Sequence, residues 1–546
     1  MLRISRRYFP IFALLLFVSL TAFSVNAYSD DEEPLYEYNG FIYGFDPYEY
    51  NSATIRGCNQ NLTHLVIPSI IESDNWTLSV TGISGYDAWP KEMTSLEIPE
   101  TVIHIEGNLW QNCDLLEAIT VASGNPIFES VDGCLYNKMN KSLVCCPNQI
   151  ESIEIKEGTL KIENMALGQR QNLKYVRIPE SLTIIDGDPV YDNTPFLSGK
   201  VSESELVFEV SPQNSCFAVY DEALYDIRAH KLIYCRPNRV TVEFPADLRI
   251  IPDYAFWDTS LRYVDLPDGL QYIGQGAFSH TGLQNIVIPD SVVYVGSGAF
   301  EDCYSLCSAK LSSSMETINE KVFSGCPILH LVRIPASIKS IGLTAFENNV
   351  WSMIGIVDPG SYGEEYCTGW KEFETDEEHF VYYDGTDIID SGKLGNNCEW
   401  TLDIAGKLTI TGIGEIQPDP DSNDDDPYYS LPECSTVEIK KGITNIPGRI
   451  FSHAVWLELY KVEIPDTVTY IDKEAFYNCS FLDTVNIPDS VTEIGERAFA
   501  GCSSLEKLVI PESVVRIGDG AFAGCDKLEL ILPDEARFDR EKLFSW

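Results

Sequence analysis

A 23-residue period in residues 459–533 constrains the fold of this chain more than any other feature. Three successive segments read LYKVEIPDTVTYIDKEAFYNCS, FLDTVNIPDSVTEIGERAFAGCS and SLEKLVIPESVVRIGDGAFAGCD. An Ile-Pro pair, an Ala-Phe pair and a Cys recur in each segment at the same step. A fixed period of this size is typical of a solenoid, in which each repeat forms one coil.

The apolar positions of the last repeat predict how one coil folds. Leu508 and Ile510 alternate with polar residues, which predicts a short strand with one buried face. Pro511 has no amide hydrogen to donate and is expected to end the strand, and Gly518 is expected to permit a tight corner. Phe522 would then fill the space between coils. Because a single coil leaves both sides of its core open, the repeats predict a stack of coils, not a compact enzyme body.

The period divides the chain into parts. The Ala-Phe marker is regular from residue 255 to residue 346, at steps of 22 or 23, and it resumes at residue 475. We therefore expect a signal peptide at 1–27, an N-terminal cap and first irregular coil at 28–95, a first repeat array at 96–368, a charged linker at 369–394, a small β module capping the second array at 395–435, a second repeat array at 436–533 and a C-terminal tail at 534–546.

Two segments interrupt the first array. They read NPIFESVDGCLYNKMNKSLVCCP (125–147) and SPQNSCFAVYDEALYDIRAHKLIYCRP (211–237). Both contain a Phe, an Asp-Gly or Asp-Glu pair, Leu-Tyr, a polar stretch, Leu and Pro. Each is predicted to be a β-hairpin inserted into a coil, with turns at 137–141 and 226–230.

Charge and the N-terminal residues indicate export. The chain has 38 Lys and Arg against 83 Asp and Glu, a net charge of −45, which excludes nucleic acid and anionic lipid as expected partners. Three Arg precede an apolar run at 11–25, and Val25-Asn26-Ala27 resembles a signal-peptide cleavage site. The alternative is an N-terminal membrane anchor. We expect a secreted, extracellular protein and leave association with the cell surface open.

Sixteen cysteines raise the question of disulfides. Five of them follow the Phe of a repeat at one fixed position and are expected to fill a shared core slot as small apolar residues; they are Cys303, Cys326, Cys479, Cys502 and Cys525. Four others fall outside the slot and are candidates for pairing or reactivity: Cys145, Cys146, Cys216 and Cys235. The sequence has no C-x-x-C motif, which argues against a zinc ribbon or a thioredoxin-type site.

The repeat IPDSVTEIGERAFAGCSSLEKLVIP resembles the BspA-like leucine-rich repeat of secreted and surface bacterial proteins. The DGCLY hairpin, the GSYGEEYC segment and CEWTLDIAGKLTITGIGEI resemble companions of that family. The resemblance implies a leucine-rich-repeat solenoid that is β-rich and right-handed, with coils of about 23 residues, in two arrays with a small β-hairpin module between them. It also implies adhesion or recognition, in some members of host extracellular proteins.

Catalytic and metal signatures are absent from the sequence. It contains no H-E-x-x-H, G-x-S-x-G or phosphate-loop motif, and the seven His are scattered. The loop with Asp419, Asp421, Asn423 and Asp425 resembles the start of a calcium loop, but it lacks the Gly and Glu that an EF-hand needs, and a solvated acidic loop is favoured. We expect no cofactor, no metal site and no enzymatic activity.

Surface recognition is the function that remains. The outward strand positions of the first array form the candidate ligand-binding face, since Tyr and Arg often carry interface binding energy; they are Tyr175, Arg177, Arg262, Tyr263, Asp265, Gln284, Asn285, His330 and Arg333. The leading hypothesis is a secreted, non-enzymatic protein that recognises or adheres to a protein ligand, with host extracellular matrix or surface proteins as candidates. The alternative is a carbohydrate-binding or scaffold module for other secreted proteins.

Overall fold

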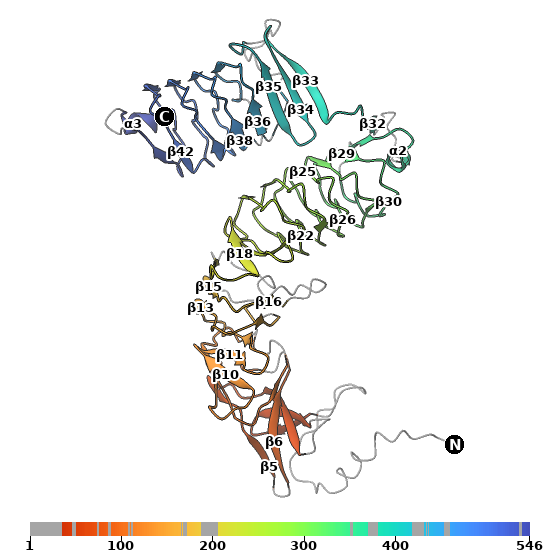
Figure 1. The fold of residues 1–546 in the computed structure, drawn as a ribbon, viewed down its shortest axis with the longest axis vertical. Coiled ribbons are helices and arrows are strands. Elements are labelled where there is room, and N and C mark those ends of the chain that lie inside the picture. The colour runs from red at the N-terminus through yellow and green to blue at the C-terminus, as the bar shows by residue number, and fades with distance from the viewer. Residues whose placement is uncertain are drawn as a thin grey trace. The chain divides into compact units, whose positions relative to one another are not determined.

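The computed structural model divides the chain into two compact units (Figure 1). The N-terminal unit comprises Met1–Asn238 and Ile250–Ala255, and the C-terminal unit comprises Arg239–Arg249 and Phe256–Trp546. The structure describes residues 35–45, 51–73, 76–85, 89–106, 110, 113–164, 166–167, 172–186, 206–349, 353–369, 380–417, 431–432, 434, 436–452, 459–533 and 538–545. The expected signal peptide and the acidic loop at 419–425 lie outside these residues.

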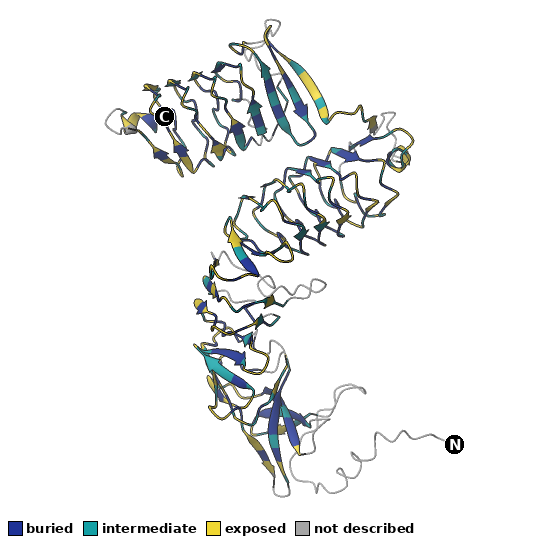
Figure 2. Cartoon of the chain, in the orientation of Figure 1, coloured by how far each residue is buried: buried dark blue, intermediate teal, exposed yellow. Residues whose placement is uncertain are grey.

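The predicted solenoid is confirmed. Most described coils have a first strand of two to four residues and a second strand of two residues, and most of these strands pair in parallel with the equivalent strands of neighbouring coils. The side formed by the first strands is called the strand face below. Buried and exposed residues alternate along the first strands, as in β42 (Lys507–Val509), where Leu508 is buried and Val509 is exposed (Figure 2).

The N-terminal unit begins with an antiparallel-rich sheet and continues into coils. The sheet contains β1 (Tyr36–Tyr38), β2 (Phe41–Phe45), β3 (Ser52–Cys58), β5 (Ile70–Ser73) and β6 (Trp76–Ile83). The strand face contains β4 (His64–Val66), β7 (Ser95–Ile98), β9 (Ala118–Val121), β13 (Ser152–Glu154), β15 (Tyr175–Ile178) and β17 (Val207–Val210). The second strands are β8 (His104–Ile105), β14 (Lys161–Ile162), β16 (Ile184–Ile185) and β22 (Ile250–Ile251).

The C-terminal unit contains the more regular coils. Its strand face contains β21 (Thr241–Val242), β23 (Tyr263–Val264), β25 (Asn285–Val287), β27 (Ser308–Lys310), β29 (Leu331–Ile334) and β31 (Ile354–Val357), then β36 (Thr436–Ile439), β38 (Lys461–Glu463), β40 (Thr484–Val485), β42 and β44 (Glu529–Ile531). The second strands are β24 (Tyr272–Ile273), β26 (Tyr294–Val295), β28 (Thr317–Ile318), β30 (Ser340–Ile341), β37 (Asn445–Ile446), β39 (Tyr470–Ile471), β41 (Glu493–Ile494) and β43 (Arg516–Ile517). A short helix, α3 (Arg540–Leu543), follows the last coil.

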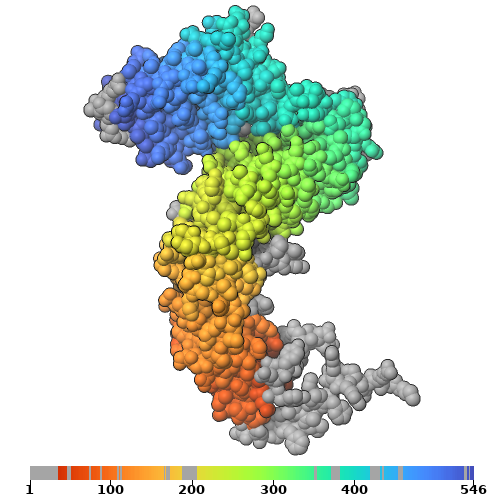
Figure 3. Space-filling view, viewed as in Figure 1, coloured from red at the N-terminus to blue at the C-terminus, as the bar shows by residue number. Residues whose placement is uncertain are grey.

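The repeated Phe residues form continuous stacks through the core of the C-terminal unit. Phe278, Phe300 and Phe323 stack with centroids 5.3 Å apart at each step, and the rings are within 7° of parallel. The second array repeats this stack with Phe451, Phe476, Phe499 and Phe522. On the face drawn in Figure 3, side chains fill the space between successive coils. The stacks therefore join each coil to its neighbours through one buried aromatic layer.

The Ile-Pro corners and the glycines have distinct roles. Pro465, Pro488 and Pro511 each accept a hydrogen bond at the carbonyl from the amide three residues later, at 3.0–3.1 Å, which closes the turn after the strand. Gly518 has a different role from the expected corner. A Cβ there would lie 2.3 Å from the backbone nitrogen of Glu496 in the preceding coil, so glycine is needed for close packing of the two backbones.

The Cys slot is buried as expected, but its thiols are also hydrogen-bond donors. The Sγ atoms of Cys479, Cys502 and Cys525 donate to the Phe carbonyl oxygens of the preceding coils at 3.2–3.4 Å, and each side chain is at most 2% exposed. Cys303 and Cys326 make the same contact. Burial raises the pKa of the Cys525 thiol to about 11 and that of Cys502 well above its usual value.

These shifts predict that stability falls in alkaline solution. A thiol whose pKa is raised by folding stabilises the folded state fully below the unfolded-state pKa of 9.0, and that contribution is lost as pH rises above it. Burial also raises the pKa of Cys479 well above its usual value, so for Cys479 and Cys502 we expect a loss of about 1.4 kcal/mol each at pH 10. Denaturant titrations at pH 8 and pH 10 would measure this, with a Cys479→Ala/Cys502→Ala variant as the comparison. An equal loss in both proteins would contradict it.

The two insertions are three-stranded rather than simple hairpins. The first contains β10 (Phe128–Val131), β11 (Cys134–Asn137) and β12 (Ser142–Cys145), and the second contains β18 (Phe217–Tyr220), β19 (Ala223–Asp226) and β20 (Lys231–Tyr234). The expected turns at 137–141 and 226–230 are confirmed. In each, the first side chain accepts two backbone amides, and the last residue has a positive φ.

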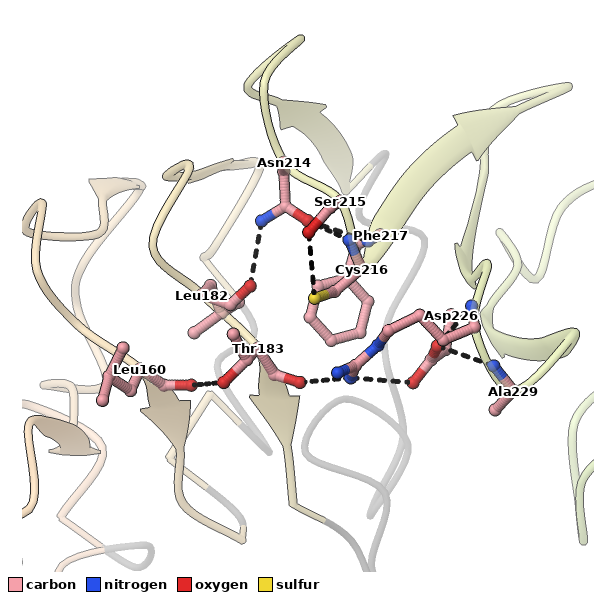
Figure 4. A network of polar contacts seen from close by, with 10 residues as sticks. Leu160, Leu182, Thr183, Asn214, Ser215, Cys216, Phe217, Asp226 and Ala229 are labelled. Atoms are coloured by element: carbon pink, nitrogen blue, oxygen red, sulfur yellow. Dashed lines mark hydrogen bonds and ion pairs between the residues drawn. The ribbon is translucent and has the colours of Figure 1, made fainter.

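A buried asparagine that the sequence analysis did not single out precedes each insertion. The Asn214 side chain donates to the carbonyl of Pro179 at 2.7 Å. It also donates to the carbonyl of Leu182 at 3.0 Å and accepts from the amides of Cys216 and Phe217 (Figure 4). Asn125 makes the equivalent four bonds in the first insertion. Each asparagine thus fastens an insertion to the coil before it.

The range expected to be a linker, 369–394, contains strands. β32 (Phe380–Tyr382) pairs in parallel with β31, and β33 (Ile388–Leu394) starts the β module. The module continues with β34 (Cys398–Asp403) and β35 (Lys407–Gly412), and β35 pairs with β36. The sheet of the module and the strand face of the second array are therefore continuous. The GSYGEEYC segment forms α2 (Tyr362–Thr368), which Ser361 caps.

Candidate binding surface

The strand face of the N-terminal unit presents alternate side chains to solvent. In β4, β7, β13, β15 and β17, each buried strand residue lies between residues that are exposed or half-buried. The outward set includes His64, Val66, Glu97, Thr120, Ser152, Glu154, Tyr175, Arg177, Val207 and Glu209. Because three of these are Glu and one is Arg, this face is acidic, whereas the sequence analysis had grouped only its Tyr and Arg.

Tyr175 and Arg177 lie at the centre of a polar cluster on this face. Arg177 is in register with Glu154 on β13 and Glu209 on β17, and its guanidinium lies 3.5 Å from each carboxylate. The Tyr175 hydroxyl donates to Glu209 at 2.6 Å, and this bond raises the pKa of Tyr175. Exposed pairs of this kind add about 0–1 kcal/mol to stability. The cluster therefore orders these side chains more than it stabilises the fold.

His64 begins the same face. Its Nδ1 lies 2.5 Å from the Ser95 hydroxyl, and its Nε2 lies 3.4 Å from Glu97. The side chains of His64 and Glu97 are both about half exposed. Ser95 and Glu97 are 31 and 33 residues from His64 in the sequence. Because the intervening chain includes an irregular coil, the 23-residue period did not predict these contacts.

Several predicted face residues of the C-terminal unit are covered by the same chain. Tyr263 is 6% exposed and stacks on Tyr460 of the second array, and the Arg262 guanidinium lies 4.9 Å from the centre of the Phe481 ring. Gln284 is 2% exposed. Tyr263 and Arg262 lie on the outward side of their coil as the alternation predicts, but residues about 200 positions later pack against them.

Arg333 is held inside the C-terminal unit. Its guanidinium donates to the carbonyls of Ile334 and Ile356 and to Asp358, and it lies 3.9 Å from the centre of the Tyr383 ring. The side chain is 7% exposed. Arg333 therefore joins β29 to β31 and the residues after β32. A ligand could reach it only if these contacts opened.

The remaining predicted residues differ in accessibility. Asp265 and His330 are exposed, and the His330 ring contacts the Ile328 carbonyl. Asn285 is half-buried, with its Oδ1 2.6 Å from the Ser308 hydroxyl. That hydroxyl also lies 2.6 Å from the carbonyl of Ile404 in the β module. The structure thus brings Tyr175 together with Arg177, and Arg262 with Tyr263, but it does not form one shared site from all nine residues.

A cavity of about 520 Å³ lies in the C-terminal unit, and its lining includes Asn285 of the first array and Ala405 of the β module. Asp265, Asp268 and Asp290 line it together with Lys310 and Lys407. Each lysine has its own acidic partner at 2.5 Å, Asp387 for Lys310 and Glu438 for Lys407. Both lysines of the lining are therefore already paired, and the lining has three carboxylates against these two lysines.

Among the described residues, no group of three or more His, Cys, Asp or Glu has a geometry that could hold a metal ion. Across the same residues, no helix has the length and apolar character needed to cross a membrane.

The family model for the BspA type leucine rich repeat region matches this chain in six copies, over residues 87–193, 227–351 and 424–545. These ranges include all of the first insertion, part of the second, the regular coils of both arrays and most of the strand face described above. A search of the curated proteins found no match.

Solved structures of bacterial leucine-rich repeat proteins are similar over most of the chain. A leucine-rich repeat protein from Eubacterium ventriosum is 16% identical, with 85% of this chain and 93% of that chain covered and a TM-score of 0.36. A leucine rich cell surface protein from Faecalibacterium prausnitzii is 18% identical, with 94% and 99% covered and a TM-score of 0.23. The pneumococcal vaccine antigen PcpA is 13% identical, with 92% and 98% covered and a TM-score of 0.31.

Proposed function

Because the chain belongs to the BspA type leucine-rich repeat family, we propose that it is an exported, non-enzymatic recognition protein. In this proposal it binds a protein ligand through the strand face of its N-terminal unit. Export is supported by the basic and apolar pattern of residues 1–27. A non-enzymatic role is supported by the lack of catalytic motifs in the sequence.

The choice of surface rests on which outward side chains of the strand face are exposed. Outward residues of the N-terminal unit such as Arg177 and Val207 are exposed, whereas Tyr263, Gln284 and Arg333 of the C-terminal unit are buried. A recognition surface needs side chains that a ligand can reach without first displacing part of the protein. The N-terminal strand face meets this condition over the described coils.

The composition of this face indicates the chemistry of its ligand. Glu97, Glu154 and Glu209 provide carboxylates, and Tyr175 and Val207 provide apolar surface beside them. The net charge of −45 would steer a basic partner toward the chain and repel an acidic one. We therefore propose a protein ligand that presents Lys or Arg next to an apolar side chain, with host extracellular or surface proteins as the candidates.

A matched pair of variants tests this surface. Tyr175→Ala/Glu209→Gln removes a Tyr and a carboxylate from the strand face, and Tyr220→Ala/Glu222→Gln makes the same chemical change on the exposed surface of the second insertion. We expect the face variant to lower the affinity for a ligand captured from matrix or mucus proteins about 30-fold, since a central interface residue contributes about 2 kcal/mol. The insertion variant should bind like the wild-type chain. Equal binding by all three proteins would rule out this face.

A carbohydrate ligand is the second candidate, and one surface feature favours it. Trp257 is 48% exposed and meets His280 edge to face, with ring centroids 6.1 Å apart. Exposed aromatic rings next to polar groups are suited to stacking on sugar rings. A glycan array probed with the wild-type chain and with Trp257→Ala distinguishes the candidates. Binding lost only in Trp257→Ala would favour carbohydrate.

A further inference from the structure

The first insertion brings two cysteines together across neighbouring strands. Leu135 on β11 pairs with Cys145 on β12, and one further step along this antiparallel pair places Cys134 opposite Cys146. Their Sγ atoms are 2.8 Å apart, and both side chains are 0% exposed. Residues directly opposite in antiparallel strands have Cα atoms about 4.5–5.5 Å apart, within the roughly 4.4–6.8 Å that a disulfide spans.

We propose that Cys134 and Cys146 are a disulfide site, which is oxidised when the chain folds in an environment that contains a small disulfide oxidant. The geometry selects this pair over the adjacent Cys145. Successive strand residues point to opposite faces, and Cys145 packs in the core cluster of Leu135, whereas Cys134 and Cys146 share the next cluster with Tyr136. Cys145 instead donates to the Cys146 carbonyl at 3.4 Å.

The oxidation is a two-step thiol–disulfide exchange. The thiolate of one cysteine attacks a sulfur of an oxidant such as oxidised glutathione, which forms a mixed disulfide and releases one glutathione thiolate. The thiolate of the other cysteine then attacks the protein sulfur of that mixed disulfide, and the second glutathione leaves. The two protein thiols lose two electrons to the oxidant, and their two protons are taken up by the released glutathione thiolates. Because both sulfurs are buried in the folded chain, we expect the exchange to occur before the insertion has packed.

The second insertion is the comparison for this site, because it has the same strands but lacks one of the two cysteines. There, Leu224 pairs with Tyr234, so the same step places Ala223 opposite Cys235. The two insertions share strand order and register, and only the first has a thiol at both positions. The bond would close the turn at 137–141 and would restrict the unfolded state of the first insertion alone.

The test follows the disulfide in the full chain. The denatured, reduced chain is refolded with oxidised and reduced glutathione, its remaining thiols are alkylated in denaturant, and it is digested with trypsin without reduction. Trypsin releases Cys134 with Cys113 on residues 92–138, and Cys146 with Cys145 on residues 142–156, so mass spectrometry will find the two peptides in one species only if a disulfide joins them. We expect this linked species, with fragment ions that assign the bond to Cys134 and Cys146, and 14 alkylated cysteines out of 16.

Variants make the assignment specific. Cys134→Ala and Cys146→Ala should remove the linked species, and Cys145→Ala should retain it. Alanine at position 134 is compatible with folding, because Ala223 occupies the equivalent place in the second insertion. Under oxidising conditions we expect Cys134→Ala to lower the melting temperature of the N-terminal unit by about 5 °C, and under reducing conditions we expect no such difference. Full alkylation of all cysteines after refolding, or a link that survives Cys146→Ala, would overturn the proposal. Neither result depends on export or on the proposed ligand.

Discussion

Replacing Phe300 with alanine is expected to lower the free energy of unfolding of the C-terminal unit by about 4 kcal/mol, because a fully buried aromatic side chain is lost and a cavity remains. Phe300 is 0% exposed and stacks between Phe278 and Phe323, each 5.3 Å away. The cavity would face two coils at once, so neither neighbour can close it alone. Chemical denaturation followed by circular dichroism would measure the loss.

Tyr304→Ala is the matched control for Phe300→Ala. Tyr304 lies in the same turn but is 61% exposed, so its removal should change the free energy of unfolding by less than about 0.5 kcal/mol. Hydrogen exchange gives a second measurement. In Phe300→Ala, amides in the coils on both sides should exchange faster than in Tyr304→Ala. Similar losses in the two variants would show that the aromatic stack does not couple the coils.

Asn214→Asp is expected to destabilise the N-terminal unit by about 3 kcal/mol, although the two side chains have nearly the same shape. The Asn214 amide nitrogen donates to two carbonyls, and the side chain is 9% exposed. A carboxylate cannot donate, so it would face these carbonyls unpaired, and burying a charge without a partner is costly. Thermal and denaturant unfolding of the variant would measure the effect.

The exposed Asn238 supplies the control for Asn214→Asp. Asn238→Asp adds the same charge to the same unit but leaves it in solvent, so we expect little change in stability. Asn125→Asp, at the start of the first insertion, should reproduce the loss because it disrupts the same four bonds. If Asn214→Asp and Asn125→Asp both unfold like Asn238→Asp, the asparagines do not fasten the insertions.

The parts of the fold that depend on local repetition could be predicted from the sequence. The step between Phe476 and Phe499 fixes one coil, and alternation in residues 507–510 identifies the buried face. The Cys slot followed from the same period. Its hydrogen bond to the Phe carbonyl could not be inferred, because a Cys that only fills the core and a Cys that also donates a hydrogen bond give the same sequence pattern. Gly518 shows a similar limit: the sequence marks a glycine, but only the structure shows the backbone of Glu496 beside it.

The candidate surface was harder to predict because it depends on contacts between distant residues. Alternation placed Tyr263 and Arg333 on the outward side of their strands, and it contains no information about what lies beyond them. Tyr460 and Tyr383 cover these residues, and no periodic signal connects either pair. Glu154 and Glu209 were missed on the N-terminal face for different reasons. Glu154 lies one regular 23-residue step before Arg177, so the period could have placed it there, whereas Glu209 lies 32 residues after Arg177 and is off the period.

The aromatic stacks affect how the number of repeats in such a chain can change during evolution. The rings of the second array stack on the rings one coil away, at 5.0–5.8 Å, and the thiol of each Cys slot donates to the coil before it. Duplication or deletion of one 23-residue unit would therefore recreate the same interfaces on both sides of the junction. Gene segments of 69 bases could be copied or lost without the need for a new core, so length is the property of this architecture that mutation can alter most freely.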